Sequence, residues 1–303
     1  MITISKVVTL WCGGVCCYAD DSSYTARGHS PGELSEKLTE KYKVMADFLT
    51  DNKLKVNDDK THLLVMTTRQ KRRHVDTSTV NIITPSAIIA PSSVERLLGA
   101  NIHQDMRWVE HVLDSDESLV KSLNTRLGAL KKICHIASFK TRKTIANGIF
   151  MSKLIYLMPL WSGCEDYLVR MLQVLQNKAA RVVTKQNHFT STKTILSACG
   201  WMSVRQLLAY HSLVLLYRTV RDKKPDYLYN KVKSGGEYRY NTRQADSGSI
   251  RKGPGPSLDI SKQSWCWKSV EVFNTLPTDL KMEKKLPSFK KRLKDWIKLN
   301  INT

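Results

Sequence analysis

Two adjacent aspartates, Asp20 and Asp21, follow an apolar stretch near the N-terminus, within the segment VCCYADDSSYT (15–25). Like charges this close are unfavourable unless a cation neutralises them. Mg²⁺ prefers hard oxygen ligands and usually takes one or two carboxylates together with substrate phosphates. A tight turn between two strands would bring both carboxylates near one point. The segment therefore predicts a divalent-metal site on a hairpin, and a solvated turn is the alternative interpretation.

The residues around the aspartate pair predict an N-terminal region of the α+β class. Residues 7–17 are apolar and β-branched enough for a buried strand before the pair. After the pair, Ser30, Pro31 and Glu33 predict a helix start, with a cap, a proline at the first helical position and a capping box. Apolar residues then recur at helical spacing up to an end near Asn52: Leu34, Leu38, Tyr42, Met45 and Leu49.

Short strands are expected after that helix. Two of them, 54–56 and 62–66, flank the turn NDDKT. Residues 80–102 suggest further short strands broken by Pro85 and Pro91. Residues 1–105 therefore combine short antiparallel strands with a helix.

The pattern changes to helices after residue 105. Four apolar stripes at helical spacing predict helices that pack a core. The stripes are Leu119, Leu123, Leu127, Leu130 and Cys134; Ile145, Ile149, Leu154 and Leu157, ended by Pro159; Leu168, Leu172, Leu175, Ala179 and Val182; and Val204, Leu208, His211 and Leu215. Their outer faces carry basic residues: Lys131, Lys132, Lys178, Arg181, Lys185, Arg218 and Arg221.

Charge is distributed very unevenly along the 303 residues, whose formal net charge is +21. Residues 1–105 hold 13 Lys and Arg against 12 Asp and Glu, and the remaining residues hold 35 against 15. A positive field of this size favours a polyanionic partner, most often nucleic acid. The residues expected to bind it are Lys131, Lys132, Lys178, Arg181 and Lys185 of the helical faces, with Arg239 and Arg243 of the loop described next. A generally basic, soluble surface is the other interpretation.

Two C-terminal segments are also basic. Residues 234–262 are rich in Gly, Ser and Pro and predict a flexible loop, in which Arg239 and Arg243 alternate with tyrosines. That pattern is typical of a surface for stacking and phosphate binding, and equally of a plain linker. The segment FKKRLKDWIKLN (289–300) predicts a basic amphipathic helix, for which docking on the protein body is favoured over a membrane surface.

The seven cysteines include no C-x-x-C pair and no set at zinc spacing, so we expect reduced, mostly buried thiols in an intracellular protein. Residues 1–19 have some features of a secretory signal, with Ala19 as the cleavage residue. The basic remainder of the chain argues against that alternative. No apolar run is long enough to predict a transmembrane helix.

Several segments, in this order, resemble reverse transcriptases of non-LTR retrotransposons, of the jockey or CR1-like group. YADD (18–21) resembles their catalytic turn, and VERLLGANI (94–102) their primer-positioning block. Further matching segments are FLTDNKLKVNDDKTHLLVM (48–66), DMRWVEHV (105–112), LQVLQNKAARVV (172–183), WMSVRQLLAYHSLVLLYRTVRDKKPDYL (201–228) and VFNTLPTDLK (272–281). The resemblance covers nearly all of residues 15–300.

The resemblance implies RNA-templated DNA synthesis by two-metal phosphoryl transfer, with RNA template, DNA primer and dNTP as partners. Asp20 would hold catalytic Mg²⁺ and Asp21 would support the site, while Tyr18 and Ala19 would shape the turn near the primer end. Lys60 would lie near the leaving pyrophosphate.

In the same family, the residues matching Leu98 and Gly99 contribute to the primer grip. An ordinary turn lysine is the alternative for Lys60. Strand packing and a bend are the alternatives for Leu98 and Gly99.

The resemblance also implies three regions: a partial palm (1–105), a helical thumb (106–190) and a basic C-terminal extension (191–303). Because the turn begins at residue 18, we expect no room for the fingers or for the upstream catalytic carboxylate. Mg²⁺ binding should then be weak or absent, and the isolated chain inactive as a polymerase. The main alternative is a non-catalytic, basic nucleic-acid-binding protein in the nucleus or cytoplasm; a third is a secreted or membrane-surface protein.

Overall fold

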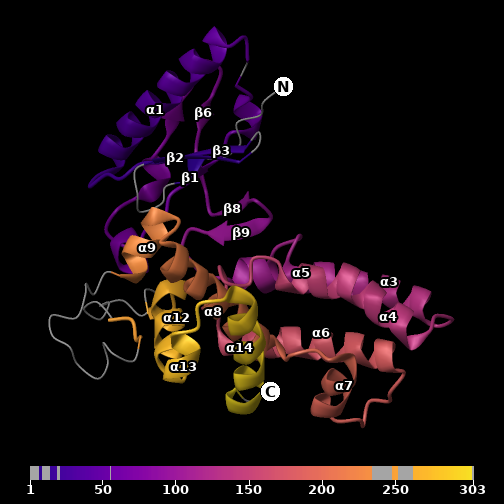
Figure 1. Cartoon of the computed structure of the whole chain (residues 1–303). Coiled ribbons are helices and arrows are strands. Elements are labelled where there is room, and N and C mark those ends of the chain that lie inside the picture. The colour runs from indigo at the N-terminus through magenta and orange to yellow at the C-terminus, as the bar shows by residue number, and fades with distance from the viewer. Residues whose placement is uncertain are drawn as a thin grey trace. The chain divides into compact units, whose positions relative to one another are not determined.

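The chain forms two compact units, Met1–Ser115 and Asp116–Thr303 (Figure 1). The computed structural model describes residues 7–8, 14–18, 21–54, 56–233, 248–251 and 262–301. The fold is mixed α+β and mostly helical. Among the described residues, all strands lie in the first unit. The units divide after Ser115 rather than after residue 105.

Within its described residues, the N-terminal unit contains one parallel sheet and three antiparallel hairpins. β1 (Val7–Val8), β4 (Leu63–Leu64) and β7 (Pro91–Ser92) form the parallel sheet, with β4 in the middle. The hairpins pair β2 (Gly14–Tyr18) with β3 (Asp21–Thr25), β5 (Ile82–Ile83) with β6 (Ile88–Ile89), and β8 (Val94–Leu97) with β9 (Ala100–His103). The expectation of antiparallel strands was thus incomplete, because parallel partners far apart in sequence leave no local signal.

Helix α1 (Pro31–Asp51) begins at the predicted residue with the predicted Ser30 cap, but the predicted capping box is not formed, because Glu33 bonds to His29 and not to the Ser30 N–H. The Ser30 hydroxyl accepts the Glu33 N–H at 3.3 Å, and Pro31 occupies the first turn. Glu33 accepts the backbone N–H of His29 at 2.7 Å, one residue before the cap, and is held by Lys37 at 2.5 Å. The carboxylate therefore stabilises the helix start from two directions.

The other end of α1 is a Schellman motif. Lys53 takes a φ of 60° and donates to the Thr50 carbonyl at 2.9 Å, and Leu54 donates to the Leu49 carbonyl at 2.8 Å. Inside the helix, Leu38, Tyr42, Met45 and Leu49 are buried as predicted. They pack in one cluster with residues of the strands and loops: Tyr24, Ala26, Leu63, Val65, Val80, Ile82 and Ile89.

Some strand predictions were wrong. Leu54 and Val56 lie in no strand; they are apolar because they pack against the α1 core. In the predicted strand 62–66 only Leu63 and Leu64 are extended into a sheet. Pro91 does not interrupt a strand but begins β7, an edge strand, where a residue without an N–H is tolerated.

The predicted buried strand 7–17 also needs correction. It is divided between β1 and β2, and the described side chains Cys16, Cys17 and Tyr18 are exposed. The buried side chains of this hairpin come instead from β3, Ser22 to Thr25. The other described helical elements of the unit are short. They are the 3-10 helices η1 (Asp58–Lys60) and η2 (Thr77–Thr79), the α-helix α2 (Arg69–Arg72) and the π-helix η3 (Glu110–Asp114).

The C-terminal unit is helical throughout its described part. Its elements are α3 (Leu119–Cys134), α4 (Phe139–Ala146), η4 (Asn147–Met151), α5 (Ser152–Ile155), α6 (Asp166–Thr184), α7 (Thr192–Cys199), α8 (Val204–Asp222), α9 (Asp226–Val232), α12 (Trp265–Asn274), α13 (Thr278–Lys281) and α14 (Leu286–Asn300). Helix α6 packs on α3, α4, α7 and α8, while α12 and α14 pack on α8 (Figure 1).

The four apolar stripes place the core well, with local shifts. All five residues of the α3 stripe are buried. In the second stripe the helix ends at Ile155, before Leu157 and Pro159, and the buried residues are Ala146, Phe150 and Leu154 rather than Ile145 and Ile149. In α6 Val183 is buried instead of Val182. In α8, His211 and Leu215 are half-buried, whereas Leu213 and Leu216 are fully buried.

The predicted C-terminal amphipathic helix is α14. Phe289, Leu293 and Ile297 are fully buried, and the Phe289 ring stacks on Tyr217 of α8 with centroids 3.9 Å apart. This apolar face packs on the protein body, as expected. Of the predicted loop 234–262, all but residues 248–251 and 262 lies outside the described residues. Within the described ranges, none of the helices is both long and apolar enough to cross a membrane.

The thiols are free, but fewer are buried than expected. Cys134, Cys164 and Cys199 are buried, Cys266 is half-buried, and Cys16 and Cys17 are exposed. Cys12 lies outside the described residues.

Candidate functional site

The hairpin of the aspartate pair consists of β2 and β3. Its antiparallel register pairs Tyr18 with Asp21 and continues to Gly14 opposite Thr25. Ala19 and Asp20 stand between the strands in sequence and lie outside the described residues. Tyr18 is 69% exposed, and Asp21 is half-buried at the first position of β3. The strands on either side of Ala19 and Asp20 therefore form a hairpin. The metal role of Asp20 stays a prediction.

The donors available for Mg²⁺ can be compared with what the ion requires. In the part of the chain that the structure describes, no three His, Cys, Asp or Glu side chains are grouped to hold a metal. Mg²⁺ demands near-octahedral oxygen coordination. The described residues do not supply such a set, so they support no chemical step through a metal.

Asp58, in the turn after α1, is a structural carboxylate. It accepts hydrogen bonds from the hydroxyls of Tyr42, Ser86 and Thr84, the last at 3.0 Å. Burial, and then the hydrogen bond to Asp58, raise the pKa of Tyr42. Asp58 thus joins α1 to the β5–β6 hairpin. A tyrosine on the buried face of a helix needs a partner for its hydroxyl, and that was the sequence signal for this contact.

The other predicted catalytic and primer-positioning residues lie on separate elements. Lys60 is exposed at the end of η1. Leu98 and Gly99 form the two-residue turn between β8 and β9, with φ of 48° and 83°. Two positive φ values in succession are typical of a type I′ hairpin turn. Gly99 is therefore required by the turn itself, which agrees with the structural alternative for this pair.

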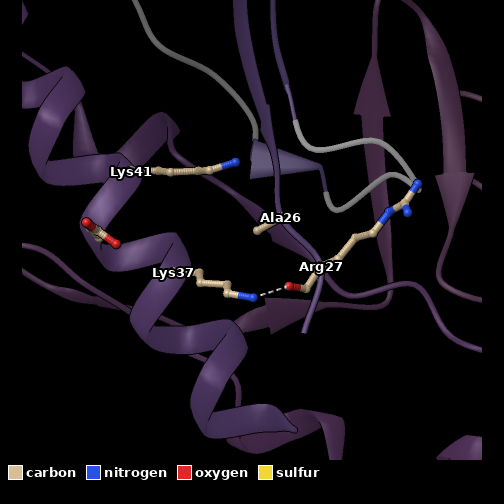
Figure 2. A pocket seen from close by; sticks show the side chains of 5 residues that line it. Ala26, Arg27, Lys37 and Lys41 are labelled. Atoms are coloured by element: carbon tan, nitrogen blue, oxygen red, sulfur yellow. Dashed lines mark hydrogen bonds between the residues drawn. The ribbon is translucent and has the colours of Figure 1, made fainter. Parts of the chain in front are cut away.

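A hollow of about 450 Å³ lies between α1 and the segment after β3, lined by Ala26, Arg27, Lys37, Glu40 and Lys41 (Figure 2). Lys37 donates to the Arg27 carbonyl at 3.0 Å, the dashed contact in Figure 2, and Lys41 donates to the Thr25 carbonyl at 2.6 Å. Both ammonium groups thus anchor the strand exit to the helix, so the hollow has a structural explanation.

The C-terminal ends of α3 and α6 lie side by side. Lys185, the C-cap of α6, donates to the carbonyl of His135, the C-cap of α3, at 3.2 Å. Exposed Lys131 and Lys132 occupy the last turn of α3, and exposed Lys140 follows in the first turn of α4. We call these four lysines (131, 132, 140 and 185) the basic end. Three of them were predicted as nucleic-acid-binding residues, and the fold gathers them.

Arg142 holds the basic end together and was missed by the sequence prediction. It is buried in α4 and donates to the Val183 carbonyl at 2.7 Å and to the Ala137 carbonyl at 2.5 Å. These bonds satisfy a carbonyl in the last turn of α6, where helix carbonyls otherwise have no intrahelical partner. The available signal was an arginine four residues before Ala146, on the buried side of the helix.

Arg181 and Lys178, the remaining described members of the predicted set, differ. Lys178 is exposed on α6. Arg181 donates to three carbonyls of the loop after α6, those of Asn187, His188 and Thr190, at 3.2 to 3.3 Å. Its guanidinium therefore fixes a loop, although its positive charge remains. Arg239 and Arg243 lie outside the described residues.

The loop clamped by Arg181 carries an exposed aromatic pair. Phe189 is 83% exposed, and its ring centroid lies 3.9 Å from that of His188, with the planes inclined by 37°. The Asn187 side chain accepts the backbone N–H of Phe189 at 3.1 Å and of Thr190 at 3.2 Å. Exposed rings beside lysines are what a surface for single-stranded nucleic acid requires.

No protein-family model, curated protein or solved structure matches this chain.

Proposed function

We propose that the chain is the C-terminal part of an RNA-directed DNA polymerase of a non-LTR retrotransposon, and that it binds nucleic acid through the basic end. One observation carries the binding proposal: Lys131, Lys132 and Lys185 gather at adjoining helix ends. They lie in a unit with 34 Lys and Arg against 13 Asp and Glu. The polymerase assignment is supported by the order of the sequence motifs and by the hairpin register around Tyr18 and Asp21.

The binding proposal predicts how the binding constant depends on salt concentration. Lysines that neutralise phosphates release counterions, so the logarithm of the binding constant falls by about 0.9 per phosphate contact for each tenfold rise in salt. The expected partners are an RNA template and a DNA primer, in the nucleus or cytoplasm. In the parent polymerase, dNTP and Mg²⁺ would join them.

The experiment is a binding series on the full chain with a short RNA–DNA duplex at increasing salt. The triple variant K131A/K132A/K185A should reduce the salt slope by about 2 to 3. The matched control is K43A/K71A/R73A, which removes three exposed charges from the N-terminal unit. Because both variants lose the same net charge, equal losses of slope would refute the assignment to the basic end.

A second experiment concerns polymerase activity. We expect no primer extension on an RNA template by the isolated chain, since its described residues hold no complete metal site. Mg²⁺-dependent extension that disappears in Asp20→Ala would overturn the inactivity and support the polymerase assignment directly. Salt-dependent binding without extension fits the proposal, and it also fits the second candidate, a non-catalytic nucleic-acid-binding protein. That candidate is favoured by the large charge excess of the C-terminal unit.

A further inference from the structure

The loop between α6 and α7, residues 185–191, combines features that a duplex-binding surface does not need. Its Phe189 is exposed to 83% and is in tilted ring contact with His188. A single exposed ring is common on protein surfaces, and covering it with a flat apolar partner removes its area from water. This ring therefore has an unused face presented to solvent.

The loop backbone is held in place despite the exposure of its side chains. Arg181 donates to three of its carbonyls, and Asn187 accepts the N–H groups of Phe189 and Thr190. A ring fixed in this way loses little freedom when it binds a ligand. The aromatic pair is thus a preorganised platform rather than a freely moving side chain.

Basic residues flank the loop in sequence. Lys185 begins the same loop, and the contact between its ammonium and the His135 carbonyl uses one of three donors. Lys193 is exposed just after the loop, in the first turn of α7. A base could stack on Phe189 while these lysines bind the flanking phosphates.

We propose that the His188–Phe189 pair stacks on unpaired bases, so that this loop binds single-stranded nucleic acid. The inference rests on the proposed nucleic-acid function and adds the class of substrate. Bases in a duplex are already stacked on each other, whereas unpaired bases offer a free face to an aromatic ring.

The surroundings of Phe189 favour this ligand over a lipid surface. Its neighbours in the loop, Gln186, Asn187 and Thr190, are polar, and burying amides and hydroxyls in a bilayer without new partners is costly. Membrane-inserting segments present several apolar side chains together. Within residues 185–191 Phe189 is the one apolar side chain, which suits a wet nucleic-acid interface. Exposed Ile133 and Ile136 near the Lys185–His135 contact, however, make the vesicle comparison below necessary.

The test uses the full chain and three fluorescent probes: a short single-stranded DNA, the same strand with abasic sites in place of bases, and the duplex with its complement. Phe189→Ala should weaken binding of the single strand by about 5- to 100-fold, and Phe189→Trp should preserve it. Binding of the abasic strand and of the duplex should change less than about twofold, since the phosphate contacts remain.

Tyr227→Ala is the matched control, because it removes an aromatic ring that is 71% exposed on α9 of the same unit. Thermal unfolding of each variant verifies folding, and Phe189 is exposed enough for its removal to leave the core intact. Vesicles of phosphatidylcholine and phosphatidylserine form the competing arm. Vesicle binding that depends on Phe189, without an effect on the single strand, overturns the inference in favour of a membrane contact.

The outcomes separate the two proposals. If the wild type binds both strands with a normal salt slope and Phe189→Ala changes nothing, the stacking inference fails and the proposed function stands. If the wild type binds no probe in a salt-dependent way, both fail. A selective loss with the single strand, retained in Phe189→Trp and absent in Tyr227→Ala, supports the inference.

Discussion

The N-terminal unit, residues 1–115, holds 14 basic and 14 acidic side chains, whereas residues 116–303 hold 34 basic and 13 acidic ones. The difference extends to how charges are partnered. In the N-terminal unit, Asp105 is held by Arg69 at 3.2 Å and Arg72 at 2.7 Å. Burial alone would raise the pKa of Asp105, but these arginines and His103 bring it below its usual range. Lys37 and Lys41 of this unit also donate to backbone carbonyls, but its basic and acidic side chains are equal in number.

The basic unit has ion pairs too, such as Arg205 with Asp166 at 2.8 Å, but its acidic side chains are too few for its cations, and several cations donate to backbone carbonyls. Arg126 donates to the Ile149 carbonyl at 2.8 Å, and Arg142, Arg181 and Lys185 also donate to carbonyls near helix ends. A carbonyl satisfies a donor and interacts favourably with a cation at a helix C-terminus, but it does not cancel the charge. Such cations therefore stabilise the fold and still contribute to a field that attracts polyanions.

The largest predicted effect tests whether the two units are separate folding units. Phe289→Ala should destabilise the C-terminal unit by about 3 to 5 kcal/mol, because it empties a fully buried site stacked on Tyr217. Denaturant unfolding followed by hydrogen exchange should show lower protection in residues 116–303 and unchanged protection in α1.

Leu299→Ala is the control for that variant, since Leu299 is 85% exposed on the same helix. It should change stability by less than about 0.5 kcal/mol. Equal loss of protection in both units of Phe289→Ala would show that they unfold together, and the comparison would lose its thermodynamic basis.

The next effect tests carbonyl partnering at the basic end. Arg142→Met should cost about 2 to 3 kcal/mol, because it leaves the Val183 and Ala137 carbonyls without this donor in a buried setting. Lys140→Met, two residues earlier and exposed, should be nearly neutral in stability. Guanidinium chloride unfolding compares the two, and similar midpoints would contradict the structural role of Arg142.

In the N-terminal unit, the test of a side chain that satisfies several polar groups compares two adjacent aspartates. Asp58→Asn should cost about 1 to 2 kcal/mol, because the hydroxyls of Tyr42, Ser86 and Thr84 lose a charged acceptor. Asp59→Asn removes the same charge from an exposed position and should change little. Equal thermal midpoints of the two variants would mean that the hydroxyl cluster is unimportant for stability.

Sequence patterns predicted the long helices well because their signals are local. The cap at Ser30, the apolar spacing of α1 and the leucine stripe of α3 each determine structure within a few turns. Short strands were poorly predicted, because β4 pairs with strands nearly sixty and thirty residues away, Val7 with Leu63 and Leu63 with Pro91. At this length, strand identity is decided by tertiary partners rather than by local propensity.

The candidate site shows the same division. Basic residues could be identified by type, but their gathering depends on contacts between distant helices, such as Lys185 with His135. Arg181 was not distinguishable from a surface cation by sequence, and Arg142 only by its position on the buried side of its helix, since their carbonyl partners exist only after packing. The metal roles of Asp20 and Asp21 stay predictions, because Asp20 lies outside the described residues.

The smallest predicted effect is a pH dependence of the stability of the N-terminal unit. The hydrogen bond from Lys37, with that from the His29 backbone N–H, lowers the pKa of Glu33 from 4.5 to about 2. A depressed folded-state pKa means that the stabilisation is present above pH 4.5 and is lost as pH falls toward 2. In Glu33→Gln, stability should therefore fall below wild type at neutral pH and converge with it in acid.

Urea midpoints measured from neutral pH to acid would reveal the convergence, and Glu36→Gln removes one charge from the exposed side of the same helix as a control. Because the Glu33 side chain is 34% exposed to water and its ion pair with Lys37 is screened there, the separation from wild type should be small. Curves for Glu33→Gln and wild type that stay parallel through acid would show that the carboxylate contributes no charge-dependent stability. The balanced charges of the N-terminal unit would then be solvated neighbours rather than stabilising pairs, and only the contacts of the half-buried Asp58 and Asp105 would distinguish it from the basic unit.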